Sequence, residues 1–275
     1  MSSEPVASAA YTEEYFRAAC GGAEFYALYG PRVPKPQLAH ALRRGELRPG
    51  LNVLDVGCGR GELIHLASGL GATAVGTDYA PAALALAREN GRGRVARCDA
   101  KALPFADGSF DRVFLLGVVD HLHRWELVAC FAELARVLRP GGFVVLHNCA
   151  NRLHYKSLTY AARRRAAAVL GALGLPVRAP RPPRSVEDEA MHVNEHSAAD
   201  LGRLFAEAGW DGVVEPMPNY KALVTELYGA TPPADLPLKA YPAWRARAAK
   251  ALARSPLAGL TSREFFAVAR PRRGS

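Results

Sequence analysis

Short apolar runs alternate with amphipathic stretches in the middle of the chain. The runs predict five strands, over Leu51–Val56, Ala72–Thr77, Val95–Cys98, Asp111–Val119 and Gly142–His147. Helical periodicity between them predicts helices from about Glu62, over Pro81–Arg88 and over Glu126–Leu138. Strands that alternate with helices in this way predict an α/β fold, with a parallel sheet covered on both faces.

The same rhythm returns near the end of the chain. Ser197, with Asp200 three residues later, predicts a helix start that resembles a capping box, and this helix is expected to run to Ala208. Two further strands are expected at Gly212–Glu215 and Phe265–Ala269. The stretches before and after this unit are too long to be simple connections, so we expect them to form a lobe or cap over one end of the sheet.

These patterns divide the chain into six parts. Tyr11, Tyr15 and Phe16 make the first part rich in aromatic side chains, which fits either a helix packed on the body or a lid over a ligand site. In chain order we expect an N-terminal helical lid (1–50), a ligand-binding core (51–150), an insertion or cap (151–196), a core helix and strand (197–215), a second insertion or cap (216–262), and a last strand with a basic tail (263–275).

Composition narrows the class of protein. The 275 residues are 49% hydrophobic and 22% charged, which is typical of a globular chain, and no apolar run approaches the ~20 residues that span a bilayer. No signal peptide is visible at the N-terminus. The five cysteines are scattered without a C-x-x-C pair, so we expect no metal site, no disulfide framework and a cytoplasmic location.

The net charge of +9 fits nucleic acid, anionic lipid or a negatively charged substrate as a partner. Much of the excess lies in Arg163–Arg165, Arg178–Arg184, Arg245–Arg254 and Arg270–Arg273. These stretches lie outside the part of the chain with the clearest motifs, so the charge by itself does not identify a partner.

The most informative stretch is Val53–Glu62, where a strand leads into closely spaced glycines and then a helix. Glycines let the backbone turn sharply and approach a ligand beyond the carboxyl ends of the strands. The dinucleotide pattern G-x-G-x-x-G is not met, because Glu62 stands where the third glycine is needed. Asp55, just before the first glycine, suits a ligand with an ammonium group. We also expect open backbone N–H groups near Gly57–Gly61 to meet an anion.

The sequence D-V-G-C-G-R-G at Asp55–Gly61 resembles the glycine-rich motif of the class I S-adenosylmethionine-dependent methyltransferases. Asp78 after the second strand, Asp99 after the third, Phe110-Asp111 and the turn Leu138–Gly142 follow in the order that this family shows. The resemblance covers residues 50–150 most clearly and 197–215 less so. It implies a Rossmann-like doubly wound sheet with an antiparallel last strand, and S-adenosylmethionine as the cofactor, with S-adenosylhomocysteine as its product.

The resemblance also assigns roles to residues. It implies that Asp78 accepts the ribose hydroxyls, that Asp99 meets the adenine amino group and that Leu116 lines the methionine end. The expected cofactor-binding residues are Asp55, Gly57, Cys58, Gly59, Gly61, Asp78, Tyr79, Asp99, Ala100 and Leu116.

Histidines supply the candidates for catalysis. His121, just after the fourth strand, is the candidate general base, or else a structural histidine at a helix start, and Asp120 either orients it or caps the helix. His192 and Glu195 are secondary candidates near the acceptor. Their stretch matches the zinc-protease pattern H-x-x-E-H, but it lies at a loop-to-helix junction, so we do not read it as a metal site. Further candidates to face the acceptor are His147, Asn148, Asn151 and Tyr155.

We therefore expect a methyltransferase that methylates an oxygen of a small molecule or of a sugar-containing natural product. The alternatives are N- or C-methylation of a small metabolite, methylation of RNA, and a binding protein that has lost turnover; a dehydrogenase is disfavoured by the glycine spacing. The expected partner is the small-molecule acceptor. Nucleic acid is not favoured, because no RNA-binding module is attached. A homodimer is compatible with the sequence, which carries no signal for oligomeric state.

Overall fold

The computed structural model describes residues 4–90, 93–148, 151–180, 182, 191–236 and 238–272. Within these residues the strands form one sheet in the order β3-β2-β1-β4-β5-β7-β6. Their bounds are β1 (Asn52–Val56), β2 (Thr73–Asp78), β3 (Arg94–Arg97), β4 (Phe110–Leu116), β5 (Leu138–Asn148), β6 (Trp210–Pro216) and β7 (Phe265–Pro271). Strand β7 is antiparallel to both β5 and β6, and the other described pairs are parallel. The predicted mostly parallel sheet with an antiparallel last strand is confirmed.

Helices cover this sheet. Some precede the first strand in the chain, and the others lie between the strands. The short helices are η1 (Ser8–Ala10), η2 (Tyr15–Ala19), η3 (Val119–His121), α6 (Tyr155–Leu158) and α12 (Ala258–Thr261). The longer ones are α1 (Ala23–Tyr29), α2 (Pro36–Arg44), α3 (Glu62–Gly69), α4 (Pro81–Glu89), α5 (Arg124–Val137), α7 (Tyr160–Ala172), α9 (Ala198–Glu207), α10 (Tyr220–Tyr228) and α11 (Ala243–Ala253).

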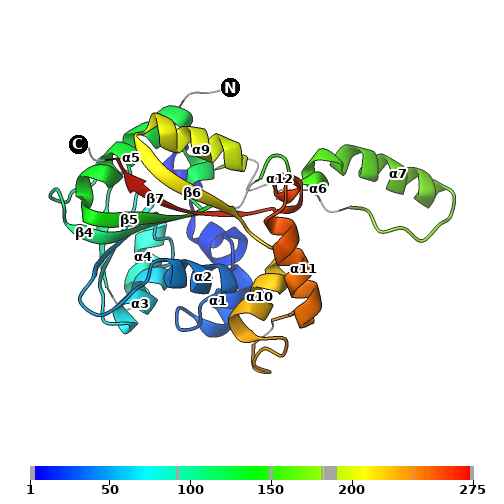
Figure 1. The fold of residues 1–275 in the computed structure, drawn as a ribbon, viewed down its shortest axis with the longest axis horizontal. Helices are drawn as coiled ribbons and strands as arrows, with labels where there is room; N and C mark the ends of the chain where they lie inside the picture. Colours follow the sequence, from blue (N-terminus) through cyan, green and yellow to red (C-terminus); the bar gives the residue numbers. More distant parts are fainter. Residues whose placement is uncertain are drawn as a thin grey trace.

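The two faces of the sheet carry separate apolar layers, and Figure 1 shows the helices that cover each face. Successive side chains of a strand point to opposite faces. Leu54 and Leu115 accordingly pack with the buried residues of α5 and α9, while Val53 and Phe114 pack with those of α2, α3 and α4. Leu223 of α10 belongs to the second layer as well. This three-layer packing fixes the carboxyl ends of the parallel strands along one edge, where α/β folds bind ligands.

Two predicted boundaries were wrong. Strand β4 ends at Leu116 and not at Val119, because Gly117 takes a left-handed backbone conformation (φ 68°) and residues 119–121 form the turn η3. Strand β5 begins at Leu138, four residues before the predicted start at Gly142, because Leu138 already pairs with Phe110 across a local register shift. The first correction places residues 117–121 beyond the carboxyl end of β4, at the carboxyl edge of the sheet.

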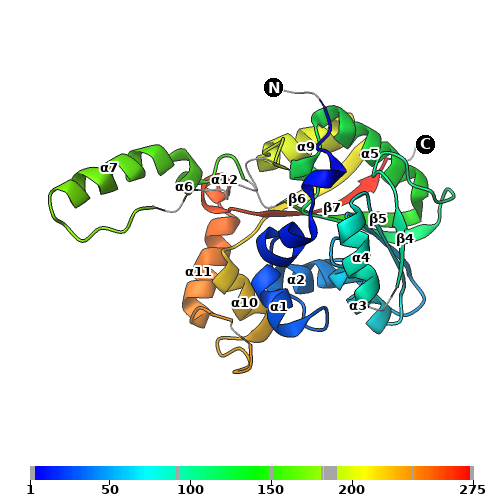
Figure 2. The same cartoon turned by 180° about the vertical axis from the view of Figure 1, so that it is seen from behind.

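The segments outside the sheet differ in how they meet the body. Helix α10 contacts α2 and α11, so this part of the chain packs against the body. Helices α6 and α7 instead project away from the sheet, both in Figure 1 and from behind in Figure 2. None of the described helices combines the length and the apolar composition that crossing a membrane requires.

Candidate active site

The loop between β1 and α3 depends on its glycines. Gly57, Gly59 and Gly61 all have positive φ angles, of 73°, 50° and 79°. A Cβ on Gly57 would lie 2.4 Å from Cγ2 of Val118, and one on Gly61 would lie 3.0 Å from Cα of Ala87. A side chain does not fit at either position. The backbone of the loop therefore packs directly against Val118, after β4, and against helix α4. The glycine pattern thus brings the end of β4 against the loop.

The N–H groups of this loop are already used within the protein. Gly57 and Cys58 both donate to the carbonyl oxygen of Thr77, at 2.7 and 2.9 Å, and Gly61 donates to the carbonyl oxygen of Cys58. Gly59 donates to Oδ2 of Asp78 at 3.1 Å. These four N–H groups are therefore not open to an anion as we expected: three of them tie the loop to β2, and the fourth bonds within the loop.

Two buried carboxylates lie beside this loop. Asp78 is buried, and its oxygens accept hydrogen bonds from the backbone of Gly59 and Ala80. Burial raises its pKa, and these hydrogen bonds only partly offset the effect. Burial also raises the pKa of Asp55 to about 8, with further contributions from Asp78 and Glu62. No hydrogen bond or cation among the described residues stabilises ionised Asp55. A ligand with a positive charge and hydroxyl donors would fit these two groups.

The remaining cofactor candidates lie at the strand ends. Asp99 is exposed and accepts from the backbone N–H of Lys101, while Nζ of Lys101 lies 2.8 Å from its Oδ2. The same ammonium lies 2.7 Å from Oε1 of the buried Glu126, so Lys101 links Asp99 to α5. Leu116 is the last residue of β4 and pairs with His147. Cys58 is buried under the loop, and Ala100 packs at the edge of the core.

The structure brings together the three residues predicted for catalysis, which we call the histidine cluster (Asp120, His121 and His192). The rings of His121 and His192 meet edge to face with centroids 4.6 Å apart. Nε2 of His192 lies 3.6 Å from Oδ2 of Asp120. The backbone N–H of Val193 donates to the carbonyl oxygen of Asp120, which fastens residues 192–194 to η3. Residues 71 to 73 positions apart in the sequence therefore meet directly.

Asp120 does not cap the helix that follows. Helix α5 begins with a capping box made by His123 and Glu126. The N-cap residue is therefore His123, three residues after Asp120, and the capping role considered for Asp120 was wrong. Asp120 is buried, and its Oδ1 has no hydrogen-bond partner among the described residues. Its closest described ring nitrogen is on His192, so any orienting effect acts on that ring.

An aromatic chain connects the N-terminal segment to the histidine cluster. The hydroxyl of Tyr11 lies 2.8 Å from Nδ1 of His121, and its ring meets that of Tyr79 with centroids 5.5 Å apart. Burial is the main cause that raises the pKa of Tyr11, so Tyr11 stays protonated. Tyr79 in turn donates to the carbonyl oxygen of Val6 at 2.7 Å. Sequence reasoning named these tyrosines but had no signal for the pairing, because Tyr11 and His121 lie 110 positions apart.

Arg60, in the glycine motif, was not recognised as important from the sequence. It is 3% exposed, and its Nη2 lies 2.8 Å from Oε2 of Glu62. Its guanidinium also donates to the carbonyl oxygens of Phe16, at 2.6 Å, and Gly21, at 3.1 Å. A buried arginine with these partners holds the N-terminal segment across the loop. The sequence could not predict this role, because the groups that accept from Arg60 are backbone carbonyl oxygens, which every residue has.

Other predicted residues are placed elsewhere. Nε2 of His147 lies 3.2 Å from Oε2 of Glu264, the residue directly before β7. Asn151 is buried and donates to the carbonyl oxygens of Gly259 and Ser262, so it ties loops together. Tyr155 is exposed on α6. His192–His196 precede the start of α9 at Ala198, so the H-x-x-E-H stretch lies outside that helix, as expected for a loop-to-helix junction.

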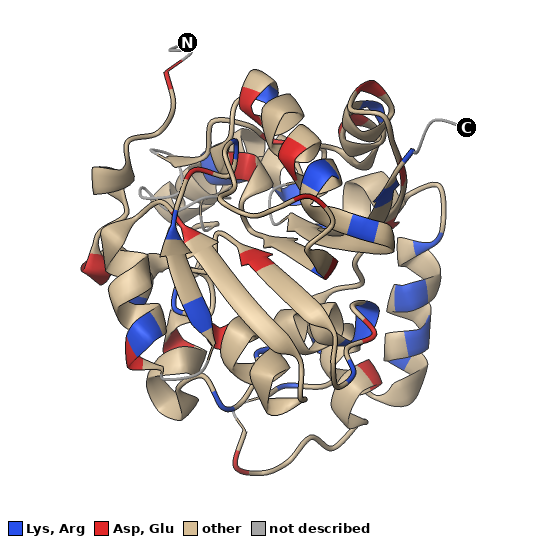
Figure 3. Cartoon of the chain, turned by 90° about the vertical axis from the view of Figure 1, so that its left-hand side faces the viewer, with Lys and Arg blue, Asp and Glu red and all other residues tan. Residues whose placement is uncertain are grey.

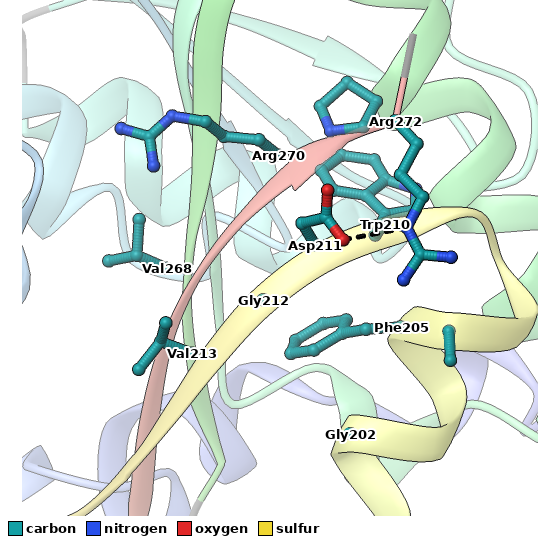
Figure 4. A pocket seen from close by; sticks show the side chains of 11 residues that line it. Gly202, Phe205, Trp210, Asp211, Gly212, Val213, Val268, Arg270 and Arg272 are labelled. Atoms are coloured by element: carbon teal, nitrogen blue, oxygen red, sulfur yellow. Dashed lines mark hydrogen bonds and ion pairs between the residues drawn. The ribbon is translucent and has the colours of Figure 1, made fainter. Parts of the chain in front are cut away.

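Figure 4 shows a surface hollow whose lining contains none of these candidate residues. It is lined by residues of α9, β6 and β7, among them Phe205 and Trp210, and the ion pair of Arg272 with Asp211 lies at its rim. Strand β6 is the edge strand farthest from β3, and Trp210 is at its amino-terminal end. The hollow therefore lies at the opposite end of the sheet from the glycine loop, so we do not assign the candidate site to it.

The histidine cluster also has the composition of a metal site. Asp120, His121 and His192 offer ligand atoms that all lie within 4.8 Å of one another. Two imidazoles and a carboxylate are ligands that zinc and other transition metals accept. The same set can equally hold and move a proton next to an acceptor.

The comparisons with known proteins bear on this arrangement. Residues 54–146 match the family model described as "Methyltransferase domain". A "Probable tRNA methyltransferase 9B" of Mus musculus is 36% identical over 101 residues, which are 36% of this chain and 22% of that protein. "Methyltransferase GfsG" of Streptomyces halstedii is 40% identical over 107 residues, 36% of this chain and 38% of that one. The matched part of this chain spans about a fifth of the length of the mouse protein and of its bovine and human counterparts.

Solved structures share the fold at low sequence identity. A putative methyltransferase in complex with the Haloferax volcanii Trm112 methyltransferase activator aligns with a TM-score of 0.56 at 18% identity, over 96% of this chain and 98% of that one. The [4+2]-cyclase SpnF aligns with a TM-score of 0.53 at 20% identity, over 89% and 85%. Residues 54–146 thus match a methyltransferase domain, and the chain shares its fold with solved S-adenosylmethionine-dependent methyltransferases.

Proposed function

We propose that the protein transfers the methyl group of S-adenosylmethionine to an oxygen of a small molecule, or of a sugar-containing natural product. The observation that carries the proposal is the contact between the glycine loop and the segment that ends in His121. Gly57 packs against Val118, and the backbone N–H of His121 donates to the carbonyl oxygen of Val118. A cofactor on the loop and an acceptor beside His121 would therefore be neighbours.

The residues of this site fit the cofactor. The buried, uncompensated Asp55 suits an ammonium group, and Asp78 has carboxylate oxygens for a ribose diol. Asp99 is available at the end of β3 for an amino group, once it is released from Lys101. When bound, the cofactor supplies an electrophilic methyl group and its own leaving group, so the protein mainly positions the acceptor.

His121 is proposed as the general base. Nδ1 of His121 lies 2.8 Å from the Tyr11 hydroxyl, and we propose the tautomer in which Nδ1–H donates to that oxygen. That tautomer leaves a lone pair on Nε2, which can take the proton of the acceptor hydroxyl as its oxygen forms the new bond to the methyl carbon and the carbon–sulfur bond breaks. His192 packs against the same ring and Asp120 lies next to His192, so both are proposed to support the position of His121.

The N-terminal segment is proposed to act as a lid. Phe16 lies against the glycine loop, where a Cβ on Gly59 would approach its ring at 3.6 Å, and Arg60 holds the carbonyl of the same residue. Tyr11 completes the histidine cluster from this segment. Closure of residues 4–22 over the loop would exclude water from the methyl group and position Tyr11 at the same time.

The test measures transfer of labelled methyl groups from S-adenosylmethionine to a small-molecule extract and, separately, to total RNA. Because a [4+2]-cyclase shares this fold, transfer must be measured directly. His121→Ala should lower turnover by about 10²- to 10⁴-fold and leave cofactor affinity within a few-fold. Tyr11→Phe should lower turnover in the same direction, whereas Tyr29→Phe, whose hydroxyl bonds Asp235 on another surface, should not. Undiminished turnover in His121→Ala would exclude it as the base.

Methylation of RNA is the second candidate, and two observations favour it. The mouse relative is named a probable tRNA methyltransferase, and the chain carries a net charge of +9. If labelled methyl groups enter RNA, with affinity that falls steeply as salt rises, the small-molecule proposal is replaced by this one.

A further inference from the structure

An arm of the chain projects from the body of the molecule (Figures 1 and 2). The arm comprises α6, α7 and the returning segment 173–180. None of the residues of α6 or α7 is buried. Apolar side chains stabilise a helix mainly when they are buried against a core, and the 13-residue helix α7 has no buried residue. The apolar side chains of the arm therefore need another explanation.

The arm exposes large apolar side chains in unusual density. Val169 is 60% exposed, Leu173 is 69% exposed and Leu175 is 50% exposed. Within 20 residues the exposed large hydrophobic side chains are Leu158, Val169, Leu170, Leu173, Leu175 and Val177. Single exposed apolar residues are normal, but a cluster of this kind marks an interaction surface.

The charge of the arm has one sign. Between residues 155 and 180 the sequence holds Lys156, Arg163, Arg164, Arg165 and Arg178 and no Asp or Glu. None of these five cations forms an ion pair with another described residue of the chain. The side of the molecule that faces away from the arm differs, because Figure 3 shows basic and acidic segments interspersed there. The arm therefore presents apolar and unpaired basic groups together.

The root of the arm is fixed to the body. Asn151 is 3% exposed, and its amide donates to the carbonyl oxygens of Gly259 and Ser262. Nε of Arg152 lies 2.7 Å from Oδ2 of Asp200 at the start of α9. The root follows the carboxyl end of β5, which is parallel to β4, so the arm leaves the sheet at the edge that carries the histidine cluster. A surface that binds the arm would thus lie near the proposed site.

We propose that this arm docks on the surface of an anionic lipid bilayer. Exposed leucine and valine side chains enter the boundary between headgroups and acyl chains, and neighbouring arginines meet the lipid phosphates. Helix α7 has 13 residues and spans about 20 Å, too short for the ~30 Å hydrocarbon core, so it lies on the membrane. A second copy of the chain fits less well, because two arms would bring ten cations together in a protein of net charge +9. This inference does not rest on the proposed methyl transfer.

The first test is flotation of the purified protein with vesicles of phosphatidylcholine alone or mixed with phosphatidylglycerol. The protein should float with the anionic vesicles and only weakly with the neutral ones, and the difference should shrink at high salt. Each basic residue near such a surface contributes roughly fivefold in partition, so Arg163→Gln/Arg164→Gln/Arg165→Gln should weaken binding by about 100-fold.

The matched control removes the same charge elsewhere. Arg48→Gln/Arg88→Gln/Arg94→Gln changes three exposed arginines that are in no described ion pair and lie on the body. This variant should keep the affinity of the unchanged protein. If both triple variants lose binding equally, net charge alone determines binding, and the proposal that the arm docks on the bilayer is wrong.

The second test addresses the apolar contribution. Leu170→Ser/Leu173→Ser should lower partition by at least about tenfold, whereas Leu28→Ser/Leu70→Ser, at exposed positions on the body, should not. Because none of these side chains is buried, thermal unfolding should be unchanged in all four variants. The proposal is overturned if anionic vesicles do not bind the protein, if light scattering shows a dimer that the arm substitutions dissociate, or if the arm substitutions instead abolish binding to RNA.

Discussion

The buried Asp55 predicts a pH-dependent affinity for S-adenosylhomocysteine, which has the ammonium group but not the sulfonium. Burial raises the pKa of the free carboxyl to about 8, so the acid is largely protonated at neutral pH. An ammonium beside it favours the ionised form and should lower that pKa by about 2–3 units. Binding then releases a proton, and affinity must rise with pH below the pKa of the free protein.

The size of the effect follows from these values. Between pH 6 and 7, where the α-amino group of the ligand remains protonated, affinity should rise by about five- to tenfold. The sign is opposite for folding: because the folded pKa is raised, Asp55 is best tolerated at low pH, and it lowers the free energy of unfolding as pH rises from about 4 towards 8. Asp78 and Glu62 face the same carboxyl and contribute to the shift.

Calorimetry measures both affinity and proton release. Titrations in two buffers that differ in ionisation enthalpy should give close to one proton released near pH 7 for the unchanged protein. In Asp55→Asn both the proton release and the rise with pH should vanish, and affinity at pH 7 should fall. Asp107→Asn, at an exposed carboxylate paired with Arg136, is the control and should behave as the unchanged protein. A flat pH dependence in the unchanged protein would refute the assignment of Asp55 to the ammonium.

Three further outcomes follow from the geometry. Gly57→Ala should cost about 2–5 kcal/mol in chemical denaturation, from its positive φ and its clash with Val118; a loss under about 1 kcal/mol would contradict the clash. Arg60→Met should make the amides of residues 8–22 exchange hydrogen at least about tenfold faster without affecting β5, since two charge-assisted bonds to carbonyls are lost; unchanged exchange there would show that Arg60 does not hold this segment. A chelator should leave turnover intact; loss of turnover restored by a divalent cation would show that the histidine cluster binds metal.

The core of the fold could be predicted because its signals are local. The alternation of side chains along each strand and the glycines after β1 are written in neighbouring residues, so strand positions and the ligand edge followed from the sequence. Asp55 and Asp78 were placed at strand ends for the same reason, and the structure buries both. The end of β4 was misplaced because apolar residues continue past Gly117, whose left-handed conformation decides the boundary.

The rest of the site depends on contacts between distant residues. Tyr11 reaches His121 across 110 positions, and His192 lies beside them because the backbone of the next residue, Val193, donates to Asp120. The partners of Arg60 are carbonyl oxygens, which every residue possesses and which leave no trace in the sequence. Nothing in the sequence indicated that loop N–H groups are used, because the acceptors of Gly57, Cys58 and Gly59 are Thr77 and Asp78 on another strand. Such pairings are determined only when the elements pack.

The position of β7 has a consequence for synthesis. It lies between β5 and β6 and is the described hydrogen-bonded neighbour of β6, although residues 265–271 are translated nearly 50 positions after β6 ends. A nascent chain therefore holds β6 without its neighbouring strand until residues 265–271 leave the ribosome. Chains cut short before Phe265 would lose two strands together, and the incomplete sheet would present the edge of β5 to chaperones or to other unfinished copies.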